Sequence, residues 1–280
     1  MATTKKPGTA VAKWDEELAK QAAIAAGMED STASGQFFSL KGGVLQWNDA
    51  PLQGNQMGVI ILDSILENVF YEGKYDPEVP QGPICFAFGR VESELEPHKL
   101  VVEASNQQHD HCAGCPMNEW GSAEVGRGKA CRNTRRLAMI PAGTFSEAGK
   151  FQLITDPEHF ESAAVGYMKL PVTSVKGYAS FVKQVAGALQ RPPFGIATKV
   201  KVVPDPKSQF KVVFEPIVNL PDELMAVIMK RHTDAKAAID FPYTPFEEEP
   251  APAKSRAAQR PAAKGSGRPP VKGGKAGRKY

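Results

Sequence analysis

The chain has 280 residues, of which 42% are hydrophobic and 23% charged, a composition that excludes a fibrous or wholly disordered protein. The formal net charge of +3 is unevenly distributed: residues 251–280 hold nine basic and no acidic side chains, whereas residues 1–250 hold 25 basic and 31 acidic ones. The body therefore carries a net charge of −6, and a strongly basic tail follows it.

Several classes of protein are excluded by local patterns. No apolar region follows the first lysines, as a secretory signal would need, and neither end carries a lipidation motif. The longest apolar run, at 59–62, stops at Asp63 and is far too short to span a membrane. Three of the four cysteines lie between residues 112 and 131, which does not suit a secreted disulfide framework. We expect a soluble protein in a reducing compartment, with no membrane partner.

The first 36 residues read as a tail plus one helix, from Asp15 to Ala26, whose weak apolar face suits contact with a partner. Residues 37–40 and 44–47 then predict a hairpin around a Gly-Gly turn. Met57–Phe70 is apolar with many β-branched residues and predicts a long bent strand, although 60–69 also suits a short amphipathic helix.

A short apolar strand is predicted at Ile84–Phe88. Residues 90–134 show little apolar periodicity and hold the other three cysteines. Long segments without structure are uncommon in compact domains, so a bound metal is the expected source of order in this one.

The second half of the chain has clearer periodicity. Met168–Val172 predicts a strand, and Ser174 is suited to cap a helix that ends at the prolines 192–193. Two strands follow, at 196–203 and 210–214, joined by a Pro-Asp-Pro turn. The first of them has an apolar face and a partly basic face that includes Lys199 and Lys201, two candidate contacts for nucleic acid.

A second helix is predicted from about Leu220 to Ala238, with four side chains turned inward: Leu224, Val227, Ile228 and Ala235. The order strand, helix, strand, strand is typical of the back half of an OB-type barrel. We therefore expect an α+β, mainly β fold: an OB-type barrel over 37–241, with a zinc-stapled loop inserted at about 90–134 and a C-terminal helix. Residues 242–280 lack apolar periodicity and predict a disordered basic tail.

The sharpest local motif is Cys112-Ala-Gly-Cys115, which turns two thiolates toward one point. Cys131 is the natural third ligand for a tetrahedral Zn²⁺. For the fourth position Cys85 competes with His109 and His111, and we favour Cys85 because one site then uses every cysteine. Four thiolates leave no position for water, which predicts a structural rather than a catalytic zinc.

The run His109-Asp110-His111 supports an alternative, a metal-dependent nuclease, if an open coordination position replaces Cys85. The simpler interpretation is that His109, Asp110 and His111 belong to a polar surface loop without a catalytic role. A glycine-rich stretch at 121–128 lacks the Lys-Ser/Thr that a phosphate-binding loop needs, so no nucleotide hydrolase is implied.

Cations close to Trp120 form a second pattern: Arg127, Lys129, Arg132, Arg135 and Arg136. Cations for phosphates and an aromatic face for bases are the combination that binds single-stranded nucleic acid. The alternative is a solvated basic loop whose Trp120 packs on the metal-binding turn.

Further stacking candidates lie beside turns and charged residues, namely Trp47, Tyr71 and Tyr75, with Lys74 as a neighbouring cation. Other aromatic residues sit at strand or helix spacing, where most are core: Phe86, Phe88, Tyr178 and Phe194.

Seven motifs between residues 38 and 131 together resemble a family of tailed-bacteriophage early proteins: Phe38-Ser-Leu-Lys-Gly-Gly-Val-Leu45, Gly54-Asn55, Ile61-Leu-Asp-Ser-Ile-Leu-Glu-Asn68, Tyr71-Glu-Gly-Lys-Tyr-Asp-Pro77, Ile84-Cys-Phe-Ala-Phe-Gly89, Cys112-x-x-Cys-Pro-x-Asn-x-Trp-Gly-Ser122 and Gly126-Arg-Gly-Lys-Ala-Cys131. The resemblance covers roughly residues 37–140. By its architecture this family is similar to phage single-stranded DNA-binding proteins. These are OB-fold proteins of DNA replication and recombination, and some carry a structural zinc.

The resemblance implies a protein that is not an enzyme and that acts in the cytoplasm of an infected bacterial host. Its expected partners are single-stranded DNA and phage replication proteins. One departure is the tail, which is basic here and often acidic in such proteins, with Glu247–Glu249 as the only acidic remnant. A zinc-containing transcription or virion accessory protein is the remaining alternative, beside the nuclease.

Overall fold

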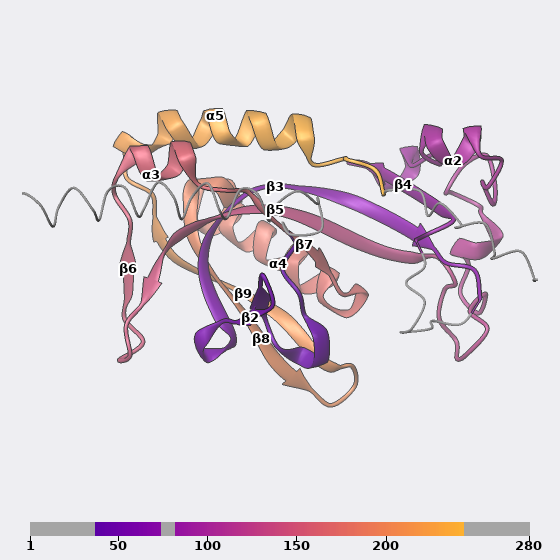
Figure 1. Ribbon diagram of the computed structural model, residues 1–280, viewed down its shortest axis with the longest axis horizontal. Helices are drawn as coiled ribbons and strands as arrows, with labels where there is room; N and C mark the ends of the chain where they lie inside the picture. The colour runs from indigo at the N-terminus through magenta and orange to yellow at the C-terminus, as the bar shows by residue number, and fades with distance from the viewer. Residues whose placement is uncertain (1–36, 74–81, 244–280) are drawn as a thin grey trace, which may run out of the picture. The chain divides into compact units, whose positions relative to one another are not determined.

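The computed structural model describes residues 37–73 and 82–243. The fold is α+β and mainly β, built on a seven-stranded antiparallel sheet with few helices (Figure 1). Its two longest strands, β3 (Gln56–Phe70) and β5 (Arg132–Phe145), pair with each other from Gly58–Gly143 to Val69–Arg132. The predicted helix at 15–26 and the basic tail lie outside the described residues.

Shorter strands extend the sheet on both sides of this central pair. At the edge of β3, its first residues pair with β8 (Ile196–Asp205) and its last with β4 (Cys85–Gly89). Along β5, β7 (Gly166–Leu170) pairs near the start and β6 (Phe151–Leu153) at the end. Finally, β9 (Gln209–Asn219) pairs with β8. A separate two-stranded sheet joins β1 (Gln46–Trp47) to β2 (Ala50–Pro51).

The sheet does not close into a barrel within the described residues, which corrects the expected closed form. A barrel would need β7 to pair with β9, but β7 has only five residues and Pro171 ends it. Helix α4 (Val172–Leu189) starts there and packs against both β9 and β5. After β7 the chain thus enters α4, and β7 and β9 do not pair.

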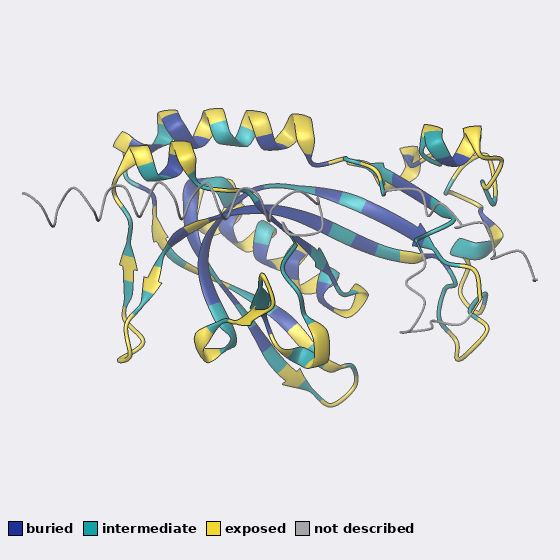
Figure 2. Cartoon of the chain, in the orientation of Figure 1, coloured by how far each residue is buried: buried dark blue, intermediate teal, exposed yellow. Residues whose placement is uncertain are grey.

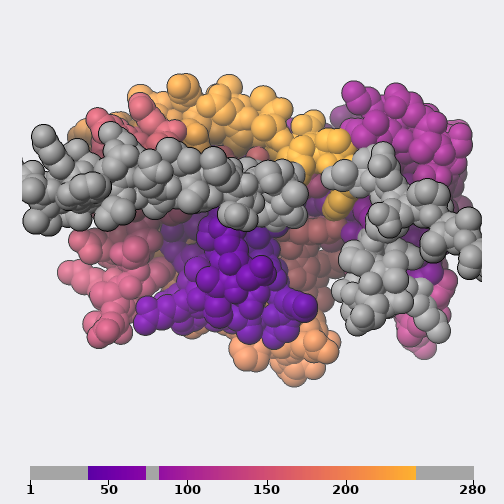
Figure 3. Space-filling view, viewed as in Figure 1, coloured from indigo at the N-terminus to yellow at the C-terminus, as the bar shows by residue number. Residues whose placement is uncertain are grey.

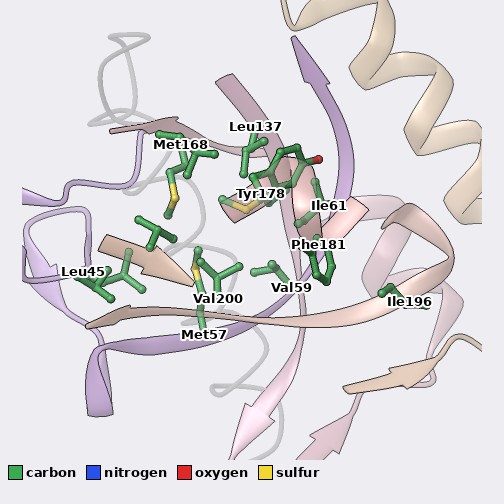
Figure 4. Packing of buried hydrophobic residues seen from close by; sticks show 14 of the residues in the cluster. Leu45, Met57, Val59, Ile61, Leu137, Met168, Tyr178, Phe181, Ile196 and Val200 are labelled. Carbon is green, nitrogen blue, oxygen red and sulfur yellow. The ribbon is translucent and has the colours of Figure 1, made fainter. Parts of the chain in front are cut away.

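Both faces of the central strands are buried. Val59 and Ile61 of β3 belong to the core beneath α4 (Figure 4), whereas Ile60 and Leu62 belong to the core beneath α5 (Asp222–Ala238). Figure 2 shows β3 and β5 buried along most of their lengths, with α5 exposed on its outer side. A strand covered on both faces reads as a continuous apolar run, which is why a helix at 60–69 also fitted the sequence; that alternative is wrong.

Several other expectations can be compared with the structure. The strands predicted at 196–203 and 210–214 are confirmed, as is the last helix with its four inward side chains. The hairpin at 37–47 is reduced to one bridge, between Ser39 and Gln46. Ser174 does not cap α4: it lies inside the helix, where its buried hydroxyl accepts a hydrogen bond from the Val212 N–H at 2.9 Å. No helix in the described ranges is long and apolar enough to cross a membrane.

Candidate nucleic-acid interface and cysteine cluster

Residues 90–131, which we call the cysteine lobe, connect β4 to β5 through short helical turns: η4 (Glu92–Glu94), α2 (Lys99–Glu103) and η5 (Pro116–Asn118). The magenta surface at the right of the space-filling view belongs to the lobe (Figure 3). Its apolar core is small, since Val101 and Phe86 pack with Val69 of β3 in a cluster that also contacts Tyr243. Beyond β4, apolar burial therefore supplies little of its order.

Backbone hydrogen bonds and a glycine with positive φ determine the conformation of the Cys112–Cys115 turn. The Cys115 N–H donates to the Cys112 carbonyl at 3.5 Å, and Gly114 takes a φ of +79°, which a side chain would disfavour. The Cys131 N–H donates to the Met117 carbonyl at 2.7 Å, which holds the end of the lobe against this turn. The local sequence Cys-Ala-Gly-Cys is thus sufficient to explain the turn.

All four cysteines line one small cavity of about 20 Å³, and all four are free thiols. Burial raises the pKa of Cys112 to about 11 and that of Cys131 to about 12, and the neighbouring cysteines add to both shifts. Within residues 37–73 and 82–243, no group of three or more His, Cys, Asp or Glu side chains is arranged to hold a metal ion as it stands. Cys85, on β4, and the three lobe cysteines nevertheless converge from separate segments.

The histidines beside the cysteines are exposed and already engaged. The His109 ring accepts a hydrogen bond from the His111 N–H at 3.2 Å, and the His111 ring lies 3.3 Å from Glu96. Asp110 is exposed. Both histidines line the cysteine cavity, as do the partly buried Cys85 thiol and the other three cysteines.

Trp120 is 80% exposed on a loop closed by a hydrogen bond from the Gly121 N–H to the Gly128 carbonyl at 2.9 Å. This exposure contradicts packing of the indole on the metal-binding turn. Lys129 lies with its Nζ 5.9 Å from the indole centroid, and Arg127 on the same loop is exposed. The loop therefore presents a free aromatic face together with cations.

A second cation–aromatic group stands where β3 ends and β5 begins. The guanidinium of Arg132, an exposed residue, lies 5.5 Å from the ring centroid of half-buried Tyr71. Lys169 of β7, a residue that the sequence patterns did not single out, approaches the same ring at 5.8 Å. The predicted neighbours Lys74 and Tyr75 lie outside the described residues.

Arg136 does not belong to this surface, and its predicted role in nucleic-acid binding is wrong. It is 1% exposed and pairs with the fully buried Glu67 at 3.1 Å. Its guanidinium also lies 4.2 Å from the Phe241 ring centroid and donates to the Phe241 carbonyl at 2.7 Å. Because successive strand residues face opposite ways, the adjacent Arg135 instead faces α4, where its guanidinium lies 5.7 Å from the Tyr178 ring centroid.

The remaining predicted contacts lie elsewhere. Trp47 packs on Phe38, with ring centroids 4.4 Å apart, at the wall of a groove of about 640 Å³ that no Lys or Arg of the described chain lines. Lys199 forms an ion pair with Glu215, and Lys201 is half-buried beside it on the same face of β8. These residues therefore do not extend the cationic surface of the lobe.

The structure thus places Trp120 and Lys129 within the cysteine lobe, and Tyr71 and Arg132 beside it. Comparison of the chain with protein-family models, with curated proteins and with solved structures finds no match. A functional inference has to come from the geometry of these side chains.

Proposed function

We propose that this protein binds single-stranded DNA without sequence preference and without catalysis, in phage DNA replication or recombination. The observation that carries the proposal is the exposed Trp120 indole with Lys129 beside it, together with exposed Arg132 at the half-buried Tyr71 ring. Lys and Arg side chains neutralise phosphates, and an aromatic ring stacks on any base, so this combination needs no base-specific hydrogen bonds.

Strand connectivity supports the same function at the level of fold. Strands β3, β5, β7, β8 and β9 correspond to strands 1 to 5 of an OB-fold. Their order in the sheet, β7-β5-β3-β8-β9, is then 3-2-1-4-5, with α4 following the third strand as in that fold. The barrel is open because the third and fifth strands do not pair. OB-folds bind oligonucleotides with the loop between their first two strands, and the cysteine lobe occupies that position here. We therefore propose an open OB-type fold with a large insertion in this loop.

We further propose that Cys85, Cys112, Cys115 and Cys131 hold one structural Zn²⁺. The donor set fits, because Zn²⁺ prefers four thiolates in structural sites and the four thiols already share one cavity. The cysteines would bind the ion as thiolates, so the four thiols would release their protons on binding. The metal would tie the lobe to β4 and to the start of β5, and so hold the Trp120 loop in place.

Fluorescence polarisation of the full chain with labelled single-stranded and duplex oligonucleotides tests the function. We expect tighter binding to single strands, with an affinity that falls steeply as salt rises. Trp120→Ala should cost about 1–3 kcal/mol of binding free energy, the value of one stacked base. Val125→Ala, at an equally exposed position of the same loop, is the matched control and should change nothing. Equal affinity for the two DNA forms would refute the proposal.

The zinc site is tested with the metal itself. Native mass spectrometry of the full chain should show one Zn²⁺, and Co²⁺ substitution should give the absorption bands of a tetrahedral tetrathiolate. Cys85→Ser should weaken metal binding and alter the cobalt bands, whereas His111→Ala should leave both unchanged. The reverse result would make His111 the fourth ligand, and a chain that binds no metal would refute the site.

A further inference from the structure

A cationic pocket lies on the face of β5 opposite to Arg136. Its volume is about 340 Å³, within the range of small-ligand sites, and it opens between β3, α4, α5 and the turn η6 (Pro193–Gly195). Arg135 and Lys183 supply its positive charge. The carboxylate of Asp63 also lines it but is paired with Arg90 at 2.6 Å, so the pocket keeps a net positive charge.

A β-bulge shapes one wall of this pocket. The β3–β5 register shifts between Ile61 and Asp63, which leaves Leu62 as the extra residue. The Leu62 carbonyl accepts a hydrogen bond from His232 Nδ1 of α5 at 2.7 Å, and this bond fixes the imidazole. The imidazole in turn stacks on Phe194, with centroids 4.3 Å apart and planes 23° apart. His232 and Phe194 thus form a flat aromatic wall, in which the imidazole is held by the hydrogen bond to Leu62 and by stacking on Phe194.

Arg135 also lines the pocket, and only some of its N–H groups donate hydrogen bonds within the protein. One terminal nitrogen of Arg135 donates to Ser64 Oγ at 3.2 Å, and its ring neighbour Tyr178 is buried in the core beneath α4. Within the described residues, Arg135 Nε is buried and has no hydrogen-bond acceptor. Because Nε is buried, a phosphate in the pocket would pair with the terminal guanidinium nitrogens instead. Lys183 is exposed on α4 at the pocket mouth.

We propose that this pocket binds one nucleotide of the single strand, with the base against the Phe194–His232 stack and the phosphate between Arg135 and Lys183. The inference rests on the proposed function and adds a contact site to the Trp120 and Tyr71 groups. Stacking on a flat wall and charge pairing with phosphate are both independent of base identity, as sequence-independent binding requires.

The test compares two lysines of α4 in the full chain. Lys183→Gln removes a pocket cation, whereas Lys176→Gln removes an exposed charge from the same helix outside the pocket and serves as its control. With oligothymidylate, Lys183→Gln should weaken binding several-fold and reduce the salt slope by about 0.7, the value for one phosphate contact on a single strand. Lys176→Gln should leave both quantities unchanged.

Photocrosslinking locates the base directly. An oligothymidylate carrying 5-iododeoxyuridine should crosslink to Phe194 or His232 as well as to Trp120, and free thymidine monophosphate should compete only weakly. If the chain binds single strands but the two lysine variants behave alike and crosslinks map to Trp120 alone, the pocket assignment is overturned and the proposed function stands. If the full chain binds no single-stranded DNA, both are overturned.

Discussion

The central sheet and the cysteine lobe are ordered by different physical means. The sheet buries both faces of β3 and β5 in two apolar cores, one beneath α4 and one beneath α5. The lobe has only a small cluster around Val101 and Phe86, plus four thiols around one cavity. Apolar burial orders the sheet, whereas the lobe has a much smaller apolar cluster, and we propose that its cysteines supply the rest of its order. The side chains that we propose for DNA binding lie in the lobe or next to it.

The largest expected effect is the loss of the buried ion pair in the sheet. Arg136→Met leaves the Glu67 carboxylate buried without its strongest partner, which should lower the free energy of unfolding by about 3–5 kcal/mol. Urea denaturation of the full chain measures this change. The double variant Arg136→Met, Glu67→Met removes both charges and should recover part of the loss. A single variant as stable as the original chain would show that the Arg136–Glu67 ion pair does not stabilise the fold.

Metal removal should affect the lobe alone. If the proposed zinc site exists, a strong chelator should speed amide hydrogen exchange across residues 90–131 and leave the protection of residues 137–140 in β5 unchanged. Hydrogen exchange followed by mass spectrometry resolves the two regions. Loss of protection in both would show that the sheet also depends on the lobe, and the distinction between the regions would fail.

The smallest effect on structure is expected from the basic tail. A chain that ends at Pro250 loses nine positive charges and should bind single-stranded DNA more weakly, with a flatter salt dependence. Its preference for single strands over duplex should remain, because that preference comes from the aromatic contacts. Polarisation titrations at several salt concentrations measure both quantities. If the preference disappears with the tail, the folded part is not the binding site.

The sequence patterns predicted most of the strands but missed β5, the one that joins the two regions. Its apolar stretch, Leu137–Ile140, is short, follows three arginines and ends at Pro141, so it lacks the alternation of a half-exposed strand. Only its pairing with β3 and β7, with a core on each face, makes it a central strand. Ser174 was misassigned for a similar reason, because its partner Val212 is distant in sequence.

Local chemistry, by contrast, could be predicted from the sequence. The Cys-Ala-Gly-Cys turn, the inward face of α5 and the charge of the tail follow from residue type and short spacing. Tertiary structure alone decided which of the neighbouring arginines is available to a ligand. Arg132 is exposed, Arg135 enters a pocket and Arg136 is buried against Glu67. Exposure depends on what packs against each face of a strand, and those partners come from segments up to a hundred residues away along the chain.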